Sequence, residues 1–107
     1  MNDQTIEQEI QQKELNAPRI TKEQIDALMA EVHFFVVAPP GSTSTFAHAY
    51  LDGKFYLDTG HSACVSPENF NAEIGEKIAL SKAEVAARNK LWELEGYRLY
   101  QSLKEAQ

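Results

Sequence analysis

The sequence predicts an α+β fold: an N-terminal helix, a three-stranded antiparallel meander and a long C-terminal helix. Two observations carry this prediction. β-branched and aromatic residues gather between residues 33 and 59, in short segments bounded by turn signals. Apolar residues at helical spacing flank that region on both sides. The 107 residues suffice for one small domain, which we expect to span residues 20–107.

Residues 1–19 form a polar N-terminal arm in this prediction. They are rich in glutamine and glutamate, and Ile6, Ile10 and Leu15 are the large apolar side chains after Met1. This spacing permits a short helix, and an arm without fixed structure is an equally good interpretation.

The first firm helix begins at Thr21. The sequence "TKEQ" matches a capping box, in which Thr21 and Gln24 each accept a hydrogen bond from the other's backbone N–H. An apolar stripe at helical spacing follows, consisting of Ile25, Leu28, Met29 and Val32.

Three segments predict the strands. "HFFVVA" (33–38) is β-branched and aromatic, and we expect it to be buried on both faces. "TFAHAYL" (45–51) alternates, so Phe46, His48 and Tyr50 share one face. Asp52-Gly53 then signals a two-residue type I′ turn, and "KFYLDT" (54–59) is the returning strand.

The period changes after Ser66, which predicts the last helix. Ser66-Pro67-Glu68 matches an N-cap, a proline at the first helical position and an acid in the first turn. We expect a short turn there, followed by a long helix from about Ala72 to Lys104. Glycine costs ~1 kcal/mol relative to alanine inside a helix, so Gly96 can mark a break.

Two apolar stripes on this long helix exceed what one small sheet can cover. We therefore expect the second stripe to face another helix, supplied by a partner subunit in a dimer or larger homo-oligomer. The first stripe consists of Ile74, Ile78, Val85, Trp92, Leu99 and Leu103, and the second of Leu80, Ala83, Ala87, Leu91 and Leu94.

Charge and composition exclude several classes of protein. The net charge of −6 argues against general nucleic-acid binding, which normally uses a basic face. No apolar run approaches the ~20 residues of a membrane span, so no membrane partner is expected. One cysteine excludes a disulfide framework and fits a reducing cytosol.

The charge is unevenly distributed along the chain. Residues 76–107 hold five acids and six bases, so an anionic ligand would favour that segment. The alternative is that this segment is only a solvated helix of mixed charge.

Cys64, with His61 three residues away, is a candidate nucleophile. A catalytic cysteine needs a thiolate stabilised by a histidine, a cation or a helix N-terminus. The flanking Ala63 and Val65 indicate a small buried side chain instead, so we assign no catalytic residue. The three histidines show no paired metal motif, and no metal or cofactor is expected.

The predicted turn before the long helix is the better candidate site. Backbone N–H groups near Glu68 to Phe70 would point outward, and the helix dipole favours an anion there. Asn69 can donate and accept at the same place, and Thr59 and His61 lead into it. Arg88 and Lys90 on the long helix, of the same or a partner chain, add positive charge. The alternative is that Ser66, Pro67 and Asn69 only build the turn.

The segment "SACVSPENFNAEIGEKIALSKAEVAARNKLWELEGYRL" resembles the signature of a family of small tailed-phage proteins, the gene product forty-nine / gene sixty-six family. "ITKEQIDALMAEVHFFV" and "TSTFAHAYLDGKFYLDTGHSACV" also match, so the resemblance covers roughly residues 20–103. It implies a phage-encoded protein that works in the host cytoplasm.

The same layout is similar to the first Thoeris anti-defence protein of phages. That protein is a sponge, which binds cyclic ADP-ribose-type immune signals without degrading them, and relatives bind cyclic oligonucleotides. The resemblance implies that Asn69 matches its turn asparagine and Lys90 one of its basic helix positions. Ala86 stands at another basic position, for which Arg88 is a candidate substitute.

The resulting hypothesis is a non-enzymatic protein that sequesters a nucleotide-derived immune signal. Asn69 would hydrogen-bond a ribose or a base edge, and Lys90 and Arg88 would pair with phosphate. Phe70 or a strand aromatic would stack on a base. Two alternatives stay open. One is an accessory protein that inhibits a host protein through its acidic surface, and the other is a hydrolase that uses Cys64.

Overall fold

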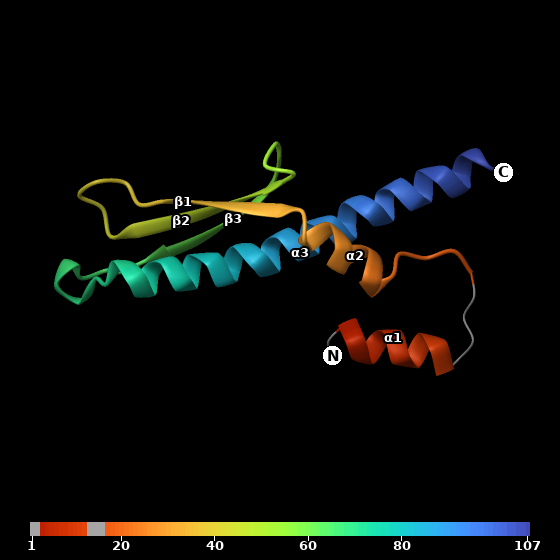
Figure 1. Ribbon diagram of the computed structural model, residues 1–107, viewed down its shortest axis with the longest axis horizontal. Helices are drawn as coiled ribbons and strands as arrows, with labels where there is room; N and C mark the ends of the chain where they lie inside the picture. Colours follow the sequence, from red (N-terminus) through yellow and green to blue (C-terminus); the bar gives the residue numbers. More distant parts are fainter. Residues whose placement is uncertain (1–2, 13–16) are drawn as a thin grey trace.

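The computed structural model describes residues 3–12 and 17–107, and it has the predicted α+β architecture (Figure 1). Helices at both ends of the chain enclose three consecutive strands, and a short 3₁₀ turn precedes the last helix. The elements are α1 (Asp3–Gln12), α2 (Lys22–Met29), β1 (Val32–Val37), β2 (Ser44–Leu51), β3 (Phe55–Ala63), η1 (Pro67–Asn69) and α3 (Ala72–Glu105).

The capping box before α2 is confirmed. The Thr21 hydroxyl accepts from the Gln24 N–H at 3.2 Å, and the Gln24 side-chain oxygen accepts from the Thr21 N–H at 2.8 Å. This start directs Ile25 into the core, where it is fully buried. The main core cluster consists of Ile25, Ala49, Leu57, Ala87 and Leu91.

The strands form one antiparallel sheet in the order β1-β2-β3, as the meander predicts. Asp52 and Gly53 both have positive φ, 57° and 69°, as a type I′ turn requires. The Lys54 N–H closes this turn on the Leu51 carbonyl at 3.0 Å. β3 continues to Ala63, four residues past its predicted end, because residues 60–63 remain paired with β2.

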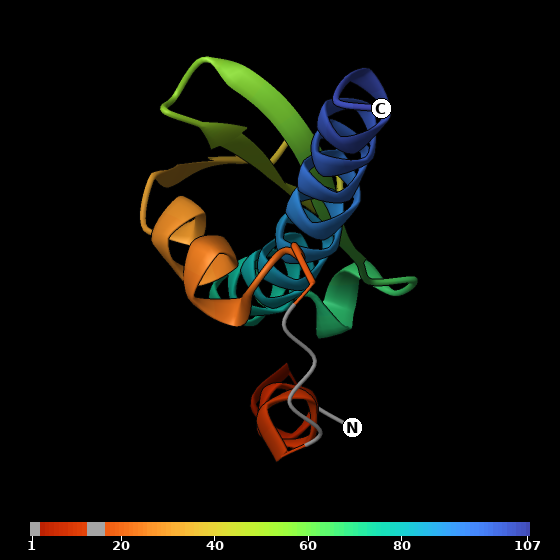
Figure 2. The ribbon, with the colours of Figure 1, turned by 90° about the vertical axis from the view of Figure 1, so that its right-hand side faces the viewer.

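The expectation that the first strand is buried on both faces is wrong. Phe35 is 50% exposed and Val37 is 45% exposed. The reason is that α3 covers only one face of the sheet, so the other face stays open (Figures 1 and 2). On β2 the alternation holds, and Thr45, Ala47 and Ala49 are the buried residues.

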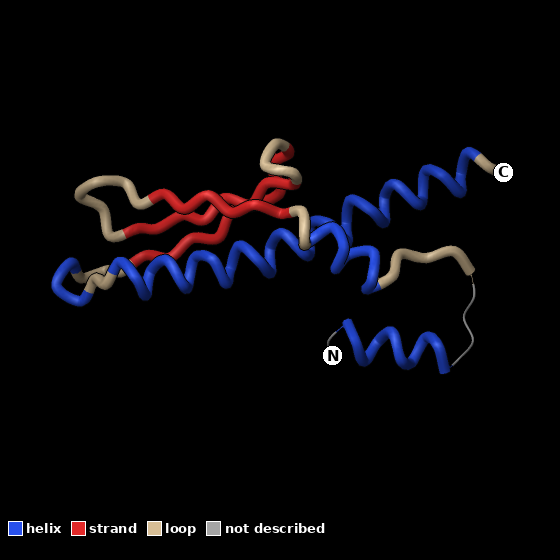
Figure 3. Tube along the Cα trace, in the orientation of Figure 1, coloured by secondary structure: helices blue, strands red, loops and turns tan. Residues whose placement is uncertain are grey.

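Gly96, where a break was one option, does not interrupt α3, which is one helix from Ala72 to Glu105 (Figure 3). Among the described residues, no neighbouring group lies within 4 Å of the place where a Cβ of Gly96 would be, so no packing contact interrupts the helix there. The first part of α3 runs along the sheet, and its C-terminal part projects past it (Figure 1). The molecule is accordingly elongated, at 57 × 29 × 20 Å.

The assignment of the two stripes on α3 is also corrected. Ala83, Ala87 and Leu91 of the second stripe face the sheet of their own chain and are buried, and no partner subunit is needed to cover them. These small side chains let the helix approach the strands closely. The first stripe is the one left largely uncovered, with Ile74, Ile78, Val85 and Leu103 exposed.

Candidate functional site

A cavity of about 200 Å³ lies where the end of β3, the turn η1 and the start of α3 meet. Asn69 and Phe70, two of the residues predicted from the sequence, line it. Hydroxyl, amide, thiol and aromatic groups surround the same space. The other lining residues are Thr43, Ser62, Ala63, Cys64, Asn71, Ile74, Gly75 and Ile78.

The helix start beside this cavity is where the sequence predicts it, since the short turn η1 precedes a helix that begins at Ala72. The Ser66 side chain makes no capping hydrogen bond, although Pro67 occupies the expected position in η1. Asn71 caps α3 instead, since its side-chain oxygen accepts from the Ile74 N–H at 3.0 Å. Asn71 is the N-cap because the backbone turns once through η1 before the long helix begins.

Two of the backbone N–H groups expected to form an anion cradle at residues 68–70 are used inside the turn. The Asn69 N–H donates to the Ser66 carbonyl at 3.1 Å, and the Phe70 N–H donates to the Pro67 carbonyl at 3.3 Å. What the turn offers a ligand is the exposed Asn69 side chain and the half-buried Phe70 ring.

Gly75 shapes the opposite wall of the cavity. A Cβ at this position would lie 3.0 Å from the Thr45 hydroxyl and 3.7 Å from the Phe70 ring. The bare glycine thus allows the first turn of α3 to lie against β2 and keeps the Phe70 ring beside the helix. The cavity therefore depends on Gly75 as well as on the turn.

Cys64 and His61 have different partners, although they are close in sequence. The half-buried Cys64 thiol donates to the Ser66 carbonyl at 3.2 Å, and the Cys64 carbonyl accepts from the Thr43 hydroxyl. The His61 ring stacks on Phe46 with centroids 4.5 Å apart, and its Nε2 is 3.0 Å from the Ser44 hydroxyl.

Thr59 lies with His61 on the open face of the sheet and not in the cavity. Its hydroxyl is 2.8 Å from Nδ1 of His48 and 2.6 Å from the Tyr56 hydroxyl. β3 alternates its side chains, so residues 59 and 61 share the face opposite α3. The structure therefore separates Thr59 and His61 from Asn69 and Phe70.

Lys90 and Arg88 lie far along α3. Eighteen residues separate Lys90 from Ala72, which corresponds to about 27 Å of helix. Lys90 therefore does not reach the cavity of its own chain. The predicted residues fall into three separate places: the cavity, the open sheet face and the middle of α3.

Arg88 is part of an ionic cluster that joins three helices. Its guanidinium is 2.6 Å from the Asp3 carboxylate of α1 and 2.9 Å from the Asp26 carboxylate of α2. Burial tends to lower the pKa of Arg88, but the hydrogen bonds to Asp3 and Asp26 outweigh it and raise that pKa. The hydrogen bond from Lys22, followed by that from Arg88, lowers the pKa of Asp26.

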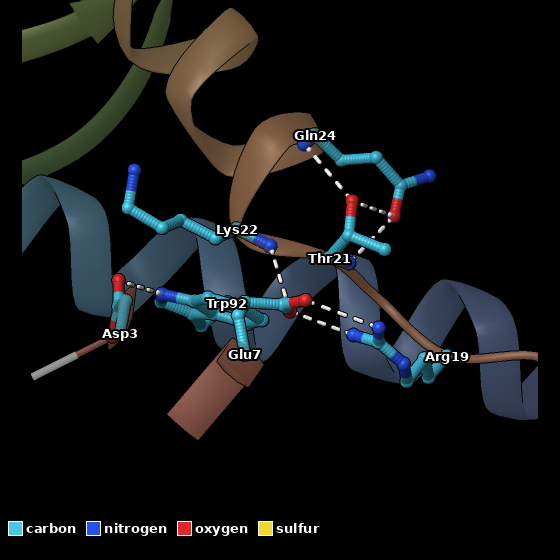
Figure 4. Close-up of polar contacts among 7 residues, drawn as sticks. All are labelled: Asp3, Glu7, Arg19, Thr21, Lys22, Gln24 and Trp92. Carbon is cyan, nitrogen blue, oxygen red and sulfur yellow. Dashed lines mark hydrogen bonds and ion pairs between the residues drawn. The ribbon is translucent and has the colours of Figure 1, made fainter. Parts of the chain in front are cut away.

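Figure 4 shows the neighbouring contacts of α1. Glu7 accepts two hydrogen bonds from Arg19, at 2.6 and 3.0 Å, and one from the Lys22 N–H at 3.2 Å. The bond from Arg19 is the main reason why the pKa of Glu7 is lowered. Trp92 donates its indole N–H to Asp3 at 3.3 Å.

Sequence reasoning missed the part that Asp3 and Trp92 play in this cluster. Asp3 lies 85 residues from Arg88, and no local pattern indicates that pairing. The one available signal was weak: Arg88 and Trp92 are four residues apart, so they share a face of the long helix.

Within residues 3–12 and 17–107, no group of three or more His, Cys, Asp or Glu side chains is arranged to hold a metal ion. In the same part of the chain, no helix has the length and apolarity required to cross a membrane.

Comparison with known protein families gives a match for most of the chain. A family model described as "Phage protein (N4 Gp49/phage Sf6 gene 66) family" matches residues 20–103. This confirms the family resemblance seen in the sequence, and the matched region begins after α1. No curated protein and no solved structure was found to match the chain.

Proposed function

Because the chain belongs to this family of phage proteins, we propose that it acts in the host cytoplasm as a binding protein that sequesters a nucleotide-derived immune signal. The signal would be of the cyclic ADP-ribose type or a cyclic oligonucleotide. The observation that carries the proposal is the cavity at η1, where an aromatic ring, amides and hydroxyls surround one space.

The groups in the cavity suit a base and a ribose. An aromatic ring such as Phe70 can stack on any base, because every base has a π-face. The Asn69 amide can donate and accept, which matches a base edge or a ribose hydroxyl. Ser62 and Thr43 contribute hydroxyls to the same walls.

The phosphates of such a ligand would lie outside the cavity. Small-molecule sites usually measure roughly 300–1,000 Å³, and this cavity is about 200 Å³. A nucleotide would therefore be only partly enclosed by one chain. We propose that Lys90 of a second copy pairs with the phosphate, since Lys90 of the same chain lies too far along α3.

The contacts of Cys64, the candidate nucleophile, also support sequestration over hydrolysis. The Cys64 thiol is hydrogen-bonded to a backbone carbonyl, and the nearby His61 is stacked on Phe46. A protein that sequesters its ligand needs tight binding, which is achieved mostly through a low dissociation rate. It needs no activated thiol.

Calorimetry with cyclic ADP-ribose isomers and cyclic dinucleotides tests the proposal, followed by mass spectrometry of the recovered ligand. We expect binding and an unchanged ligand mass. Asn69→Ala should weaken binding roughly tenfold or more, because the partner group on the ligand loses its hydrogen bond. Glu68→Ala, in the same turn but outside the cavity lining, is the matched control and should bind like the wild type.

Three results would count against this function. Absence of heat with every nucleotide tested would remove the proposed ligand class. A changed ligand mass that depends on Cys64 would indicate a hydrolase. Equal losses in Asn69→Ala and Glu68→Ala would show that the cavity does not hold the ligand.

A further inference from the structure

A second site emerges from the contacts of Asp3, and it does not depend on the proposed function. One carboxylate oxygen of Asp3 accepts from Arg88 Nε at 2.8 Å and from Trp92 Nε1 at 3.3 Å, and it lies 2.6 Å from Arg88 Nη2. Three N–H groups of α3 thus converge on a single anionic oxygen. This arrangement is that of an anion site whose present occupant belongs to the same chain.

Without Asp3, the side chains around this oxygen carry a net positive charge, which favours an anion. Arg88 and Lys22 share one remaining carboxylate, Asp26, at 2.9 and 2.6 Å. Two cations against one acid give these three side chains a net charge of +1. An open cavity of about 430 Å³ beside them is lined by Asp3, Gln4, Lys22 and Arg88, so an external anion has access.

The helix that carries Asp3 is held mainly by polar contacts. Ion pairs and hydrogen bonds of Asp3 and Glu7 connect α1 to the rest of the chain. Its apolar side chains fit less closely, since Ile6 is 42% exposed and a cavity of about 320 Å³ is lined by α1 together with Ile20 and Trp92. The Asp3–Arg88 pair is partly exposed, and such pairs contribute little to stability and weaken with salt. The Glu7 side chain in the second pair is buried.

The position of α1 also allows it to leave without disturbing the core. It lies on the side of α3 opposite the sheet (Figures 1 and 2). The buried clusters come from α2, the strands and α3, and no residue of α1 belongs to them. The family match likewise begins at residue 20, after this helix.

We propose that Arg88, Trp92 and Lys22 form a binding site for the phosphate group of a small molecule, and that Asp3 occupies it as an internal competitor. α1 is then an autoinhibitory segment that sets the affinity of the site. The carboxylate of Asp3 imitates the ligand's anion, and binding exchanges one for the other. The apparent affinity of wild-type protein equals the affinity of the open site multiplied by the fraction of molecules in which α1 is released.

Trp92 provides the readout, because it is the one tryptophan in the chain. Inorganic pyrophosphate is titrated into the full-length protein at constant ionic strength while Trp92 fluorescence is followed. Asp3→Asn removes the competing charge and keeps the shape of the side chain. We expect this variant to reach half-saturation at a concentration roughly tenfold lower than wild type.

Glu73→Gln is the control for net charge. It also removes one negative charge, but Glu73 is exposed in the first turn of α3 and pairs only loosely with Lys77 at 3.6 Å. It should titrate like wild type. In the Asp3→Asn background, Arg88→Gln should abolish the response, and Lys22→Gln should weaken it several-fold while leaving Arg88 in place.

Three results overturn the proposal. They are equal half-saturation concentrations in Asp3→Asn and Glu73→Gln, a fluorescence response that persists in Arg88→Gln, and the absence of a fluorescence response in every variant. Circular dichroism of each variant identifies one that has not folded. If Arg88→Gln is unfolded, Lys22→Gln decides in its place. Asn69→Ala should leave the pyrophosphate response unchanged, so failure of this site is distinguishable from failure of the η1 cavity.

Discussion

Gly60 of β3 lies directly against the backbone of Ala79 in α3. A Cβ on Gly60 would be 2.1 Å from the Ala79 carbonyl oxygen and 2.3 Å from the Ala83 nitrogen. Neither atom belongs to a side chain that can rotate away. The separation between sheet and helix is therefore set by this glycine and by the small residues that face it.

Gly60→Ala should destabilise the fold by about 3 kcal/mol, because α3 would have to move off the sheet. Gly96→Ala is the matched control, since it makes the same change where nothing lies within 4 Å. In that helix interior it should stabilise by about 1 kcal/mol. Urea unfolding measures both, and equal effects of the two substitutions would contradict the close approach.

The core around Ile25 should be sensitive to truncation. Ile25 is fully buried, so Ile25→Ala should cost about 2–5 kcal/mol in the free energy of unfolding. Val85 is 59% exposed, and Val85→Ala should change that free energy by no more than ~0.5 kcal/mol. A large loss from Val85→Ala, measured by thermal unfolding, would instead show that this face of α3 is covered in solution.

The N-cap of α3 gives a direct comparison between two residues. Asn71→Ala should cost about 1 kcal/mol, because the Ile74 N–H loses its acceptor. Ser66→Ala should cost less than ~0.5 kcal/mol, since its side chain makes no capping bond. Chemical denaturation of both variants tests this assignment. A larger loss of stability in Ser66→Ala than in Asn71→Ala would show that Ser66 is the cap.

Attachment of α1 should weaken in acid. The hydrogen bond from Arg19 lowers the pKa of Glu7 below its ordinary value of 4.5. The contribution of Glu7 is therefore complete above that ordinary value and is lost as the pH falls through the lower, folded-state pKa. Arg19, whose pKa is raised by the same pair, stays charged throughout this window.

Backbone amide chemical shifts of α1, recorded from about pH 7 to about pH 3, follow this release. Wild type should show a transition below 4.5 that Glu7→Gln lacks. In Glu7→Gln, α1 should already be loosened at neutral pH. Identical titrations of the two proteins would mean that the Glu7–Arg19 pair does not hold the helix.

Local signals explain why much of the fold was predictable. The capping box at Thr21 and the turn at Asp52-Gly53 depend on residues within a few positions of one another, and both form as expected. The start of α3 was predicted correctly, but its cap was not identified, because Ser66 and Asn71 both suit such a position and only Ser66 was singled out. Only the turn η1, which inserts between them, selects Asn71.

Properties that depend on tertiary structure were not accessible from the sequence. Both apolar stripes of α3 look suitable for burial, and the small residues facing Gly60 decide which one meets the sheet. Of the predicted site residues, Asn69 and Phe70 came together because they are adjacent in the chain. Arg88 could not be placed, because its partner Asp3 comes from the opposite end of the chain.

The length of α3 has a consequence for stoichiometry. Ten residues, or about 15 Å of helix, separate Arg88 from Ile78, the last residue of α3 that lines the η1 cavity. One phosphate group cannot occupy both places, so the two proposed sites would fill independently. One chain would then hold two phosphate-bearing ligands at once, and a binding isotherm that saturates at one per chain would contradict one of the two sites.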